Sequence, residues 1–127
     1  MRKAGLFLLL IALFTGCARK PDWRDPYDRG LQYLEGRRYR DAIELFTQAA
    51  EAEAEHPEIY IARGDAHARS GETAVHMAAA EADYEKAVSL DDSIAGEYLG
   101  LADIYVRRKD YDKALEILGE GMEKTEG

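Results

Sequence analysis

The chain has 127 residues and a formal net charge of −8, a length that fits one small domain. The acidic balance argues against nucleic-acid binding, because a phosphate backbone is bound through lysine and arginine side chains. The single cysteine, Cys17, excludes a disulfide within the chain.

The N-terminal segment has the pattern of an export signal. Arg2 and Lys3 precede an unbroken apolar run over residues 4–14. This run is shorter than the roughly 20 residues needed to span a bilayer. A short basic segment followed by such a run is typical of a secretory signal peptide. We therefore expect residues 1–16 to be a signal and not part of the fold.

The apolar run ends in Phe14-Thr15-Gly16-Cys17, which resembles the lipobox of bacterial lipoproteins. In that motif a peptidase cuts before a cysteine whose thiol carries a diacylglycerol; Phe14 departs from the usual leucine. The resemblance implies lipidation at Cys17 and a place in the cell envelope. Ala18 implies the outer membrane, facing the periplasm, in a Gram-negative cell. The alternatives are an ordinary cleaved signal or an uncleaved anchor.

Residues 17–26 are expected to form a tether between the lipid and the fold. Pro21 and Pro26 favour an extended, non-helical backbone. Trp23 within the tether is interpreted as lying at the lipid interface or packing on the first helix.

Beyond the tether, apolar residues recur at spacings of three and four, which predicts helices, and no alternating strand pattern is found. Small residues recur with a period near 34. Those that open each period are Gly30, Gly64 and Ala102, and those that follow them at gaps of 12, 16 and 12 residues are Ala42, Ala80 and Ala114. A fixed period of this length predicts repeated helical hairpins.

The third unit carries the pattern in full. It comprises Tyr98-x-x-Leu101-Ala102-x-x-Tyr105 and then Tyr111-x-x-Ala114-x-x-x-Leu118-x-x-Gly121. The pattern resembles the tetratricopeptide repeat. The resemblance implies an all-α fold of three helix-turn-helix hairpins, stacked as a short right-handed solenoid over residues 27–56, 57–92 and 93–127. Such a stack is usually a surface for holding another protein.

Packing explains the residue types within each unit. Small side chains on the first helix are expected to face the small side chains of the second helix, with Phe46, Tyr84 and Leu118 filling the space beside them. The second unit has four extra residues within 72–80, just over one helical turn. We expect its second helix to begin one turn early and to carry Val75, His76 and Met77 past the stack.

No set of residues predicts catalysis. His67 occupies an aromatic core position of the repeat, so packing explains it. Metal binding by His67 and His76 would require the two helices to bring them together, and no cysteine or carboxylate pattern supports it. We expect no enzyme activity, no cofactor and no metal.

The resemblance implies that the first helix of each repeat lines a concave groove for a peptide or helix. By repeat position its residues are Tyr27, Leu31, Leu34, Ile61, Asp65, Arg69, Leu99, Asp103 and Arg107. Asp65 with Arg69 and Asp103 with Arg107 are spaced as i, i+4 ion pairs, which stabilise a helix on their own. The carboxylate clamp that binds chaperone tails in this family uses Asn-type positions that are aspartates here, so that ligand is not expected.

The last helix has apolar residues that we expect to be partly uncovered, namely Leu115, Leu118 and Met122. We expect these side chains either to bind a partner or a second copy of the chain, or to remain exposed to solvent without a binding role. We therefore expect a lipid-anchored scaffold or assembly factor that binds another envelope protein. The alternative is a structural lipoprotein that forms homodimers through this end.

Overall fold

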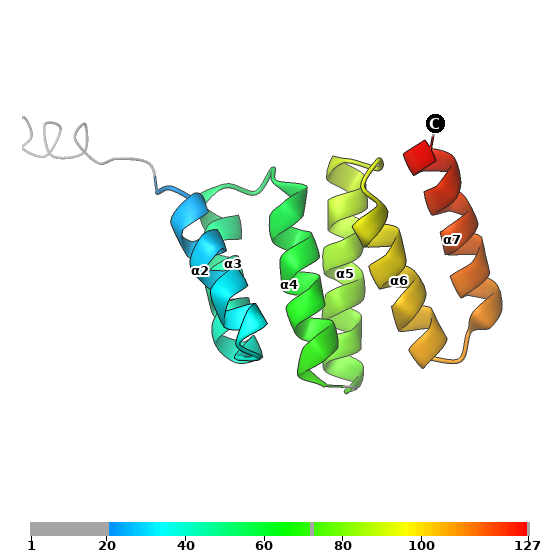
Figure 1. Ribbon diagram of the computed structural model, residues 1–127, viewed down its shortest axis with the longest axis horizontal. Coiled ribbons are helices and arrows are strands. Elements are labelled where there is room, and N and C mark those ends of the chain that lie inside the picture. Colours follow the sequence, from blue (N-terminus) through cyan, green and yellow to red (C-terminus); the bar gives the residue numbers. More distant parts are fainter. Residues whose placement is uncertain (1–20, 72, 127) are drawn as a thin grey trace, which may run out of the picture.

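The computed structural model describes residues 21–71 and 73–126, and these ranges contain helices and no strand. The helices are α2 (Arg24–Glu35), α3 (Tyr39–Ala52), α4 (Pro57–Ser70), α5 (Ala74–Leu90), α6 (Ala95–Arg107) and α7 (Tyr111–Glu126). They pair in chain order into three hairpins (Figure 1). The all-α prediction is confirmed, whereas the signal peptide and Cys17 lie outside the described residues.

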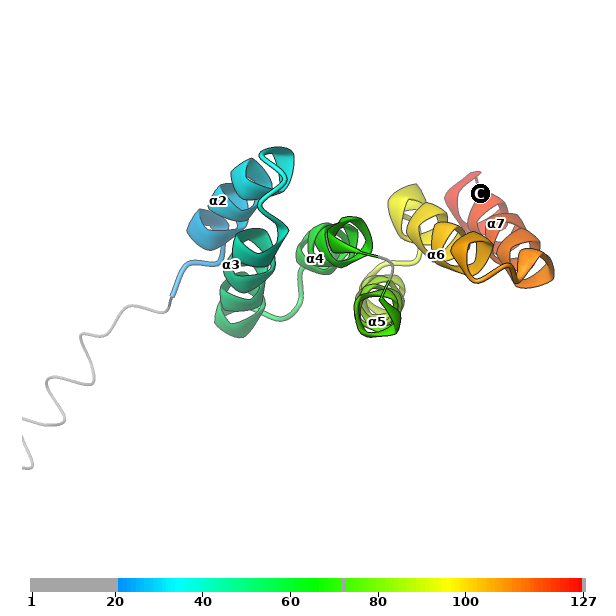
Figure 2. The same ribbon diagram turned by 90° about the horizontal axis from the view of Figure 1, so that it is seen from below.

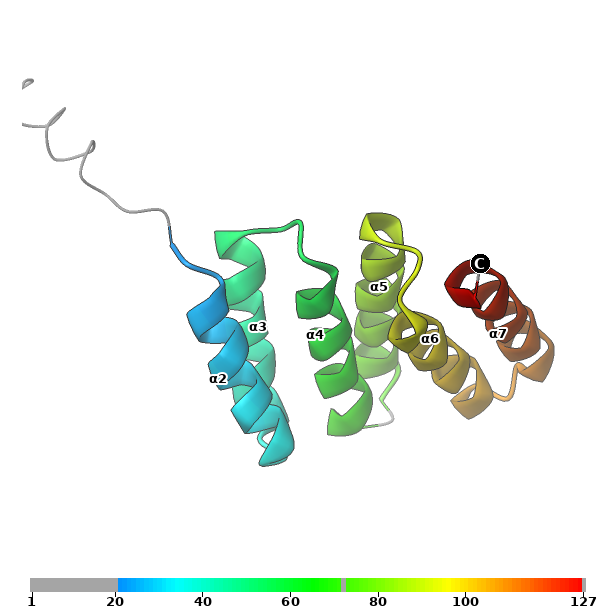
Figure 3. The same ribbon diagram turned by 45° about the horizontal axis from the view of Figure 1, so that its top comes forward.

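The first helices of the hairpins form a layer of their own. α2 contacts α4 and α4 contacts α6, whereas α3, α5 and α7 contact only helices that adjoin them in the chain (Figure 2). The hairpins follow one another along the stack, with α2 at one end and α7 at the other (Figure 3). Side chains on α2, α4 and α6 can therefore share one surface.

The four extra residues of the second unit lengthen its helices and not its turn. Each hairpin has three residues between its two helices. α4 runs one residue further past Gly64 than α2 runs past Gly30, and α5 begins three residues earlier before Ala80 than α3 does before Ala42. The early start of α5 is as expected. Val75 is exposed there, but Met77 is buried against the core, so its predicted projection is wrong.

The tether is shorter than its prolines indicated, because α2 begins at Arg24. Pro26 lies in the first turn of a helix, where a missing N–H donor costs nothing. Trp23 is buried and stacks on His56, with ring centroids 3.9 Å apart. This contact closes one end of the N-terminal core over the turn between α3 and α4.

Within each of the first two hairpins, an aromatic ring fills the space that a glycine leaves. A Cβ added to Gly30 would lie 2.6 Å from Cε1 of Phe46, and one added to Gly64 would lie 2.9 Å from Cε1 of Tyr84. Both rings are almost fully buried. The expected role of Phe46 and Tyr84 is confirmed, and the close helix approach depends on it.

Tyr84 also connects the second hairpin to the third. Its ring lies against Gly100 of α6, where a Cβ would overlap it. Its hydroxyl donates a hydrogen bond to Asp65 of α4. Burial raises the pKa of the Tyr84 phenol, and the bond to the Asp65 carboxylate raises that pKa further, so the hydroxyl remains a donor.

A second internal link is an ion pair between α4 and α5. Arg63 donates to both carboxylate oxygens of Asp83, from Nε at 2.9 Å and from Nη2 at 2.7 Å. A third donor, Nη1, reaches Thr47 of α3 at 3.3 Å. Because Asp83 is buried, losing its partner would leave an uncompensated charge in the interior, so this pair fixes the register of three helices.

One buried carboxyl has no such partner. Glu97 of α6 is fully buried, and neither of its carboxylate oxygens has a hydrogen-bond partner in the described part of the chain. Burial and the negative charges of Asp91 and Asp92 raise the pKa of Glu97 to about 7. In the folded chain this carboxyl is therefore mainly neutral below about pH 7 and mainly ionised above it.

The contact between Tyr84 and Gly100 predicts the effect of one added methyl group. Gly100→Ala should destabilise the fold by about 1–3 kcal/mol through overpacking. The matched control is Gly119→Ala in α7, where a Cβ meets nothing within 4 Å. The control should stabilise the fold by about 0.5–1 kcal/mol through helix propensity. Urea unfolding followed by circular dichroism measures both, and equal effects would contradict this packing.

Glu97 predicts a pH dependence of stability. Its pKa in the folded chain lies above its usual 4.5, so the folded state binds more protons than the unfolded state between about pH 4.5 and 7, and stability falls as pH rises through that window. Glu97→Gln should leave stability similar at pH 4 and raise it by about 1–3 kcal/mol at pH 8. Identical pH profiles for this variant and the wild type would show that Glu97 is not the cause.

The charge-matched control for that measurement is Glu123→Gln, because Glu123 is exposed on α7. This control should change stability by less than about 0.5 kcal/mol at either pH.

Candidate functional site

Residues from all three hairpins line a hollow of about 600 Å³. Its lining residues are Leu34, Glu35, Arg37, Tyr39, Ala68, Arg69, Gly71 and Arg107. We call this surface the arginine hollow. It lies where the first helices of the three hairpins end, and it therefore exists only in the stacked array.

Three arginines and one glutamate make the arginine hollow basic within an acidic chain. Arg37 follows the end of α2 with a left-handed backbone, φ 61°. Arg69 is exposed on the last turn of α4. Arg107 is held in place, because its Nη1 donates to the carbonyl oxygen of Ala68 at 2.7 Å. The hollow can therefore receive an anionic group.

The nine predicted groove residues do not all meet in one cavity. Leu34, Arg69 and Arg107 line the arginine hollow. Tyr27 and Leu31 instead pack against the buried cluster that contains Phe46. Ile61 packs against the buried cluster that contains Tyr84. Leu99 lies exposed on α6, with 60% of its surface accessible.

The two predicted acid–base pairs have different outcomes. Asp103 and Arg107 form the i, i+4 ion pair, with 2.8 Å between oxygen and nitrogen. Asp65 instead accepts the hydroxyl of Tyr84, and no ion pair joins it to Arg69 among the described residues. Asp65 therefore has a role in packing the second hairpin.

Sequence reasoning missed Arg37 and Tyr39, which line the arginine hollow from the turn after α2 and the start of α3. The signal present in the chain is the basic turn Gly36-Arg37-Arg38, followed by an aromatic residue. This basic turn becomes part of a binding surface only in the stacked array, because the neighbouring hairpins bring Arg69 and Arg107 beside it.

The two histidines considered for metal binding do come together. Nδ1 of His67 on α4 lies 3.2 Å from Nδ1 of His76 on α5. Both rings line a second hollow of about 460 Å³, which we call the histidine hollow. His67 is half-buried, so the packing role expected for it accounts for only part of its environment. In the described part of the chain, no group of three or more His, Cys, Asp or Glu residues could hold a metal ion.

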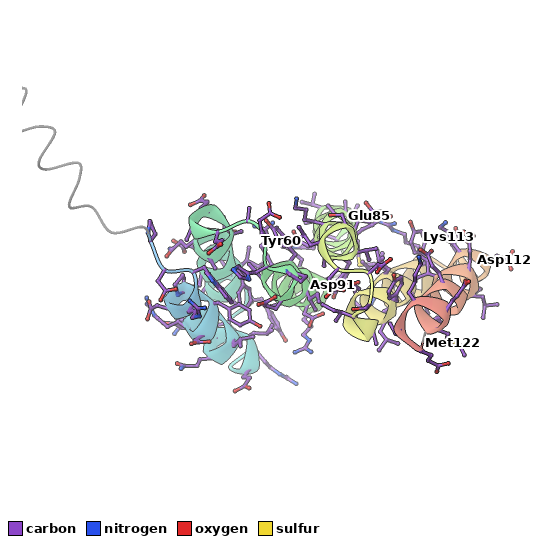
Figure 4. The ribbon with its side chains drawn as sticks, turned by 90° about the horizontal axis from the view of Figure 1, so that it is seen from above. Tyr60, Glu85, Asp91, Asp112, Lys113 and Met122 are labelled. Carbon is purple, nitrogen blue, oxygen red and sulfur yellow. The ribbon has the colours of Figure 1, made fainter. Side chains whose placement is uncertain are left out.

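The outer face of α7 exposes large apolar side chains. Leu115 is 68% exposed and Met122 is 60% exposed, and Met122 points away from the stack (Figure 4). Tyr111, on the same helix, is 58% exposed and was not predicted. Leu118 differs, since it packs partly buried against the core. None of the helices in residues 21–71 and 73–126 is long and apolar enough to cross a membrane.

Comparison with known proteins agrees with this architecture. The tetratricopeptide repeat family matches residues 27–75. No curated protein sequence matches the chain. Among solved structures, the first tetratricopeptide repeat of Spaghetti (RPAP3), bound to the HSP90 peptide SRMEEVD, is similar at a TM-score of 0.73 and 21% identity, over 84% of this chain and 81% of that one.

The matched residues extend from α2 into the start of α5, and the solved structure extends the likeness over the stack. The three hairpins also share the small and aromatic positions described above. Residues 27–75 therefore match the tetratricopeptide repeat family, and the stack as a whole has the tetratricopeptide repeat fold.

Proposed function

We propose that this chain is a lipid-anchored scaffold of the bacterial cell envelope that binds an acidic peptide segment of another envelope protein. The arginine hollow is the observation that carries the proposal. A site for one partner requires residues from several repeats to converge, and this hollow draws on all three hairpins.

The charges of the hollow favour an acidic segment over a basic one. Arg37 and Arg69 can pair with carboxylates in the bidentate geometry that guanidinium groups provide. The similar repeat of Spaghetti is bound to a peptide with two glutamates and a terminal aspartate. Asp103 is paired with Arg107, which offsets its negative charge. Asp65 keeps its charge while it accepts the Tyr84 hydroxyl, but it does not line the arginine hollow.

The envelope location rests on the N-terminal sequence. The apolar run before Cys17 and the small residues at positions 15 and 16 support cleavage and lipidation at this cysteine. Two or more acyl chains hold a protein stably at a membrane, whereas one does so only marginally. In a Gram-negative cell, Ala18 favours the outer membrane, with the repeats facing the periplasm.

The exposed face of α7 favours a second candidate function, which is self-association. Tyr111, Leu115 and Met122 present more than half of their surfaces to solvent from one helix. Burying them between two copies would remove apolar area from water and stabilise a homodimer. In that case the lipoprotein would be structural.

Charge reversal in the arginine hollow tests the first function. An array of short peptides, probed with the full chain in mild detergent, should be enriched in acidic sequences. Arg69→Glu should weaken the binding of the selected peptides by roughly tenfold or more. The matched control is Arg29→Glu, an exposed arginine on α2 that does not line the hollow. Enrichment of basic sequences, or equal losses in both variants, would contradict the proposal.

Sedimentation velocity of the same preparations distinguishes the second function. Self-association is favoured by a dimer that Leu115→Glu converts to a monomer, together with no acidic enrichment on the array. Leu115 is the suitable position because Leu118 packs against the core and its replacement would also disturb folding.

The anchor is tested by Cys17→Ser. The wild type should partition into membranes and incorporate a labelled fatty acid, whereas the variant should be soluble or remain unprocessed. Gly16→Ala is the control, since it keeps a small residue before the cysteine and should keep processing. Membrane binding and processing that do not change in Cys17→Ser would falsify the lipid anchor and leave the peptide site unaffected.

A further inference from the structure

The four extra residues of the second hairpin bring His67 and His76 together. His76 is the third residue of α5, within the turn by which α5 extends beyond its counterparts α3 and α7. That extra turn carries His76 alongside the last turn of α4, where His67 lies. The nitrogens meet because the helices were lengthened while the turn kept its three residues.

The distance between the imidazoles fits a shared metal ion. Zinc binds histidine nitrogen at about 2.0–2.1 Å in tetrahedral geometry, so two ligand nitrogens of one ion lie about 3.3 Å apart. The two Nδ1 atoms of His67 and His76 are 3.2 Å apart. Little movement of either helix is therefore needed to bring both nitrogens into one coordination shell.

The surroundings leave room for the rest of the shell. The histidine hollow, about 460 Å³ in volume, is open beside both rings. It is also lined by Tyr39, Arg40, Ile43 and Ser70. The described residues supply no third His, Cys, Asp or Glu ligand, and the open hollow leaves room for water to complete the coordination. Such a site binds an exchangeable ion and not a permanent structural one.

Neutral imidazole is the form that binds metals. A hydrogen bond between the two Nδ1 atoms requires one ring to carry its proton on Nδ1 and the other to carry it on Nε2. Binding requires both rings to hold their proton on Nε2, a tautomer change that releases no net proton.

We propose that His67 and His76 form a two-imidazole site for a divalent transition-metal ion that crosslinks α4 to α5. Cu²⁺ binds there more tightly than Zn²⁺, because nitrogen sites follow the Irving–Williams order. The site is distinct from the arginine hollow, although Tyr39 lines both. Its occupation does not depend on the proposed peptide binding.

The test is a titration of the untagged full chain in mild detergent with Cu²⁺ and with Zn²⁺, against a competing colorimetric chelator. All samples carry Cys17→Ser, so that no thiol binds the metal. We expect one ion per chain and an increase in the temperature of unfolding. His67→Gln and His76→Gln should each weaken binding by roughly tenfold or more, since loss even of outer-shell partners costs 10–100-fold.

His56→Gln is the matched control, because it removes the remaining histidine, which stacks on Trp23. It should leave the affinity unchanged. His76 is half-buried in the first turn of α5, so His76→Gln alone carries the test if His67→Gln fails to fold by circular dichroism. Equal affinities in wild type, His76→Gln and His56→Gln, or no binding by the wild type, would overturn the proposal.

Discussion

The stack depends on the ring of Tyr84, which occupies the space left by glycines on two different hairpins. Gly64 lies within the same hairpin and Gly100 lies in the next one, so a single side chain sets both the helix approach and the inter-repeat contact. The bond from its hydroxyl to Asp65 orients the ring. This contact fixes the third hairpin against the second and so helps to place Arg107 beside Arg69 in the arginine hollow.

The repeat period made the helices and most of the small and aromatic contacts predictable, since these are local consequences of one hairpin. Gly30 with Phe46 and Gly64 with Tyr84 occupy matching positions of their repeats, and each contact needs only one pair of helices. Gly100 was not foreseen, because its contact with Tyr84 depends on how successive hairpins stack. The arginine hollow could not be predicted for the same reason, because Arg37 and Arg69 come together only when the hairpins stack.

The burial of two charged residues could not be predicted from the sequence for a different reason. A charged residue on a helix is by default assigned to solvent, and Asp83 and Glu97 contradict that default. Asp83 is compensated by Arg63 across two helices, so its charge is satisfied and its position is fixed. Glu97 has no hydrogen-bond partner in the part of the chain that the structure describes, and below about pH 7 the cost of its desolvation is relieved by taking up a proton.

The insertion shows how a departure from the period changes chemistry without changing the fold. A longer turn would have added exposed backbone, whereas longer helices keep every internal N–H and C=O paired except at their ends. The extension buries Met77 on one side and leaves Val75 exposed on the other. It also brings His76 to His67, because His76 lies in the turn of α5 that has no counterpart in α3 or α7. The irregular unit therefore adds a chemical feature at the end of the hairpin, where the packing of Tyr84 is undisturbed.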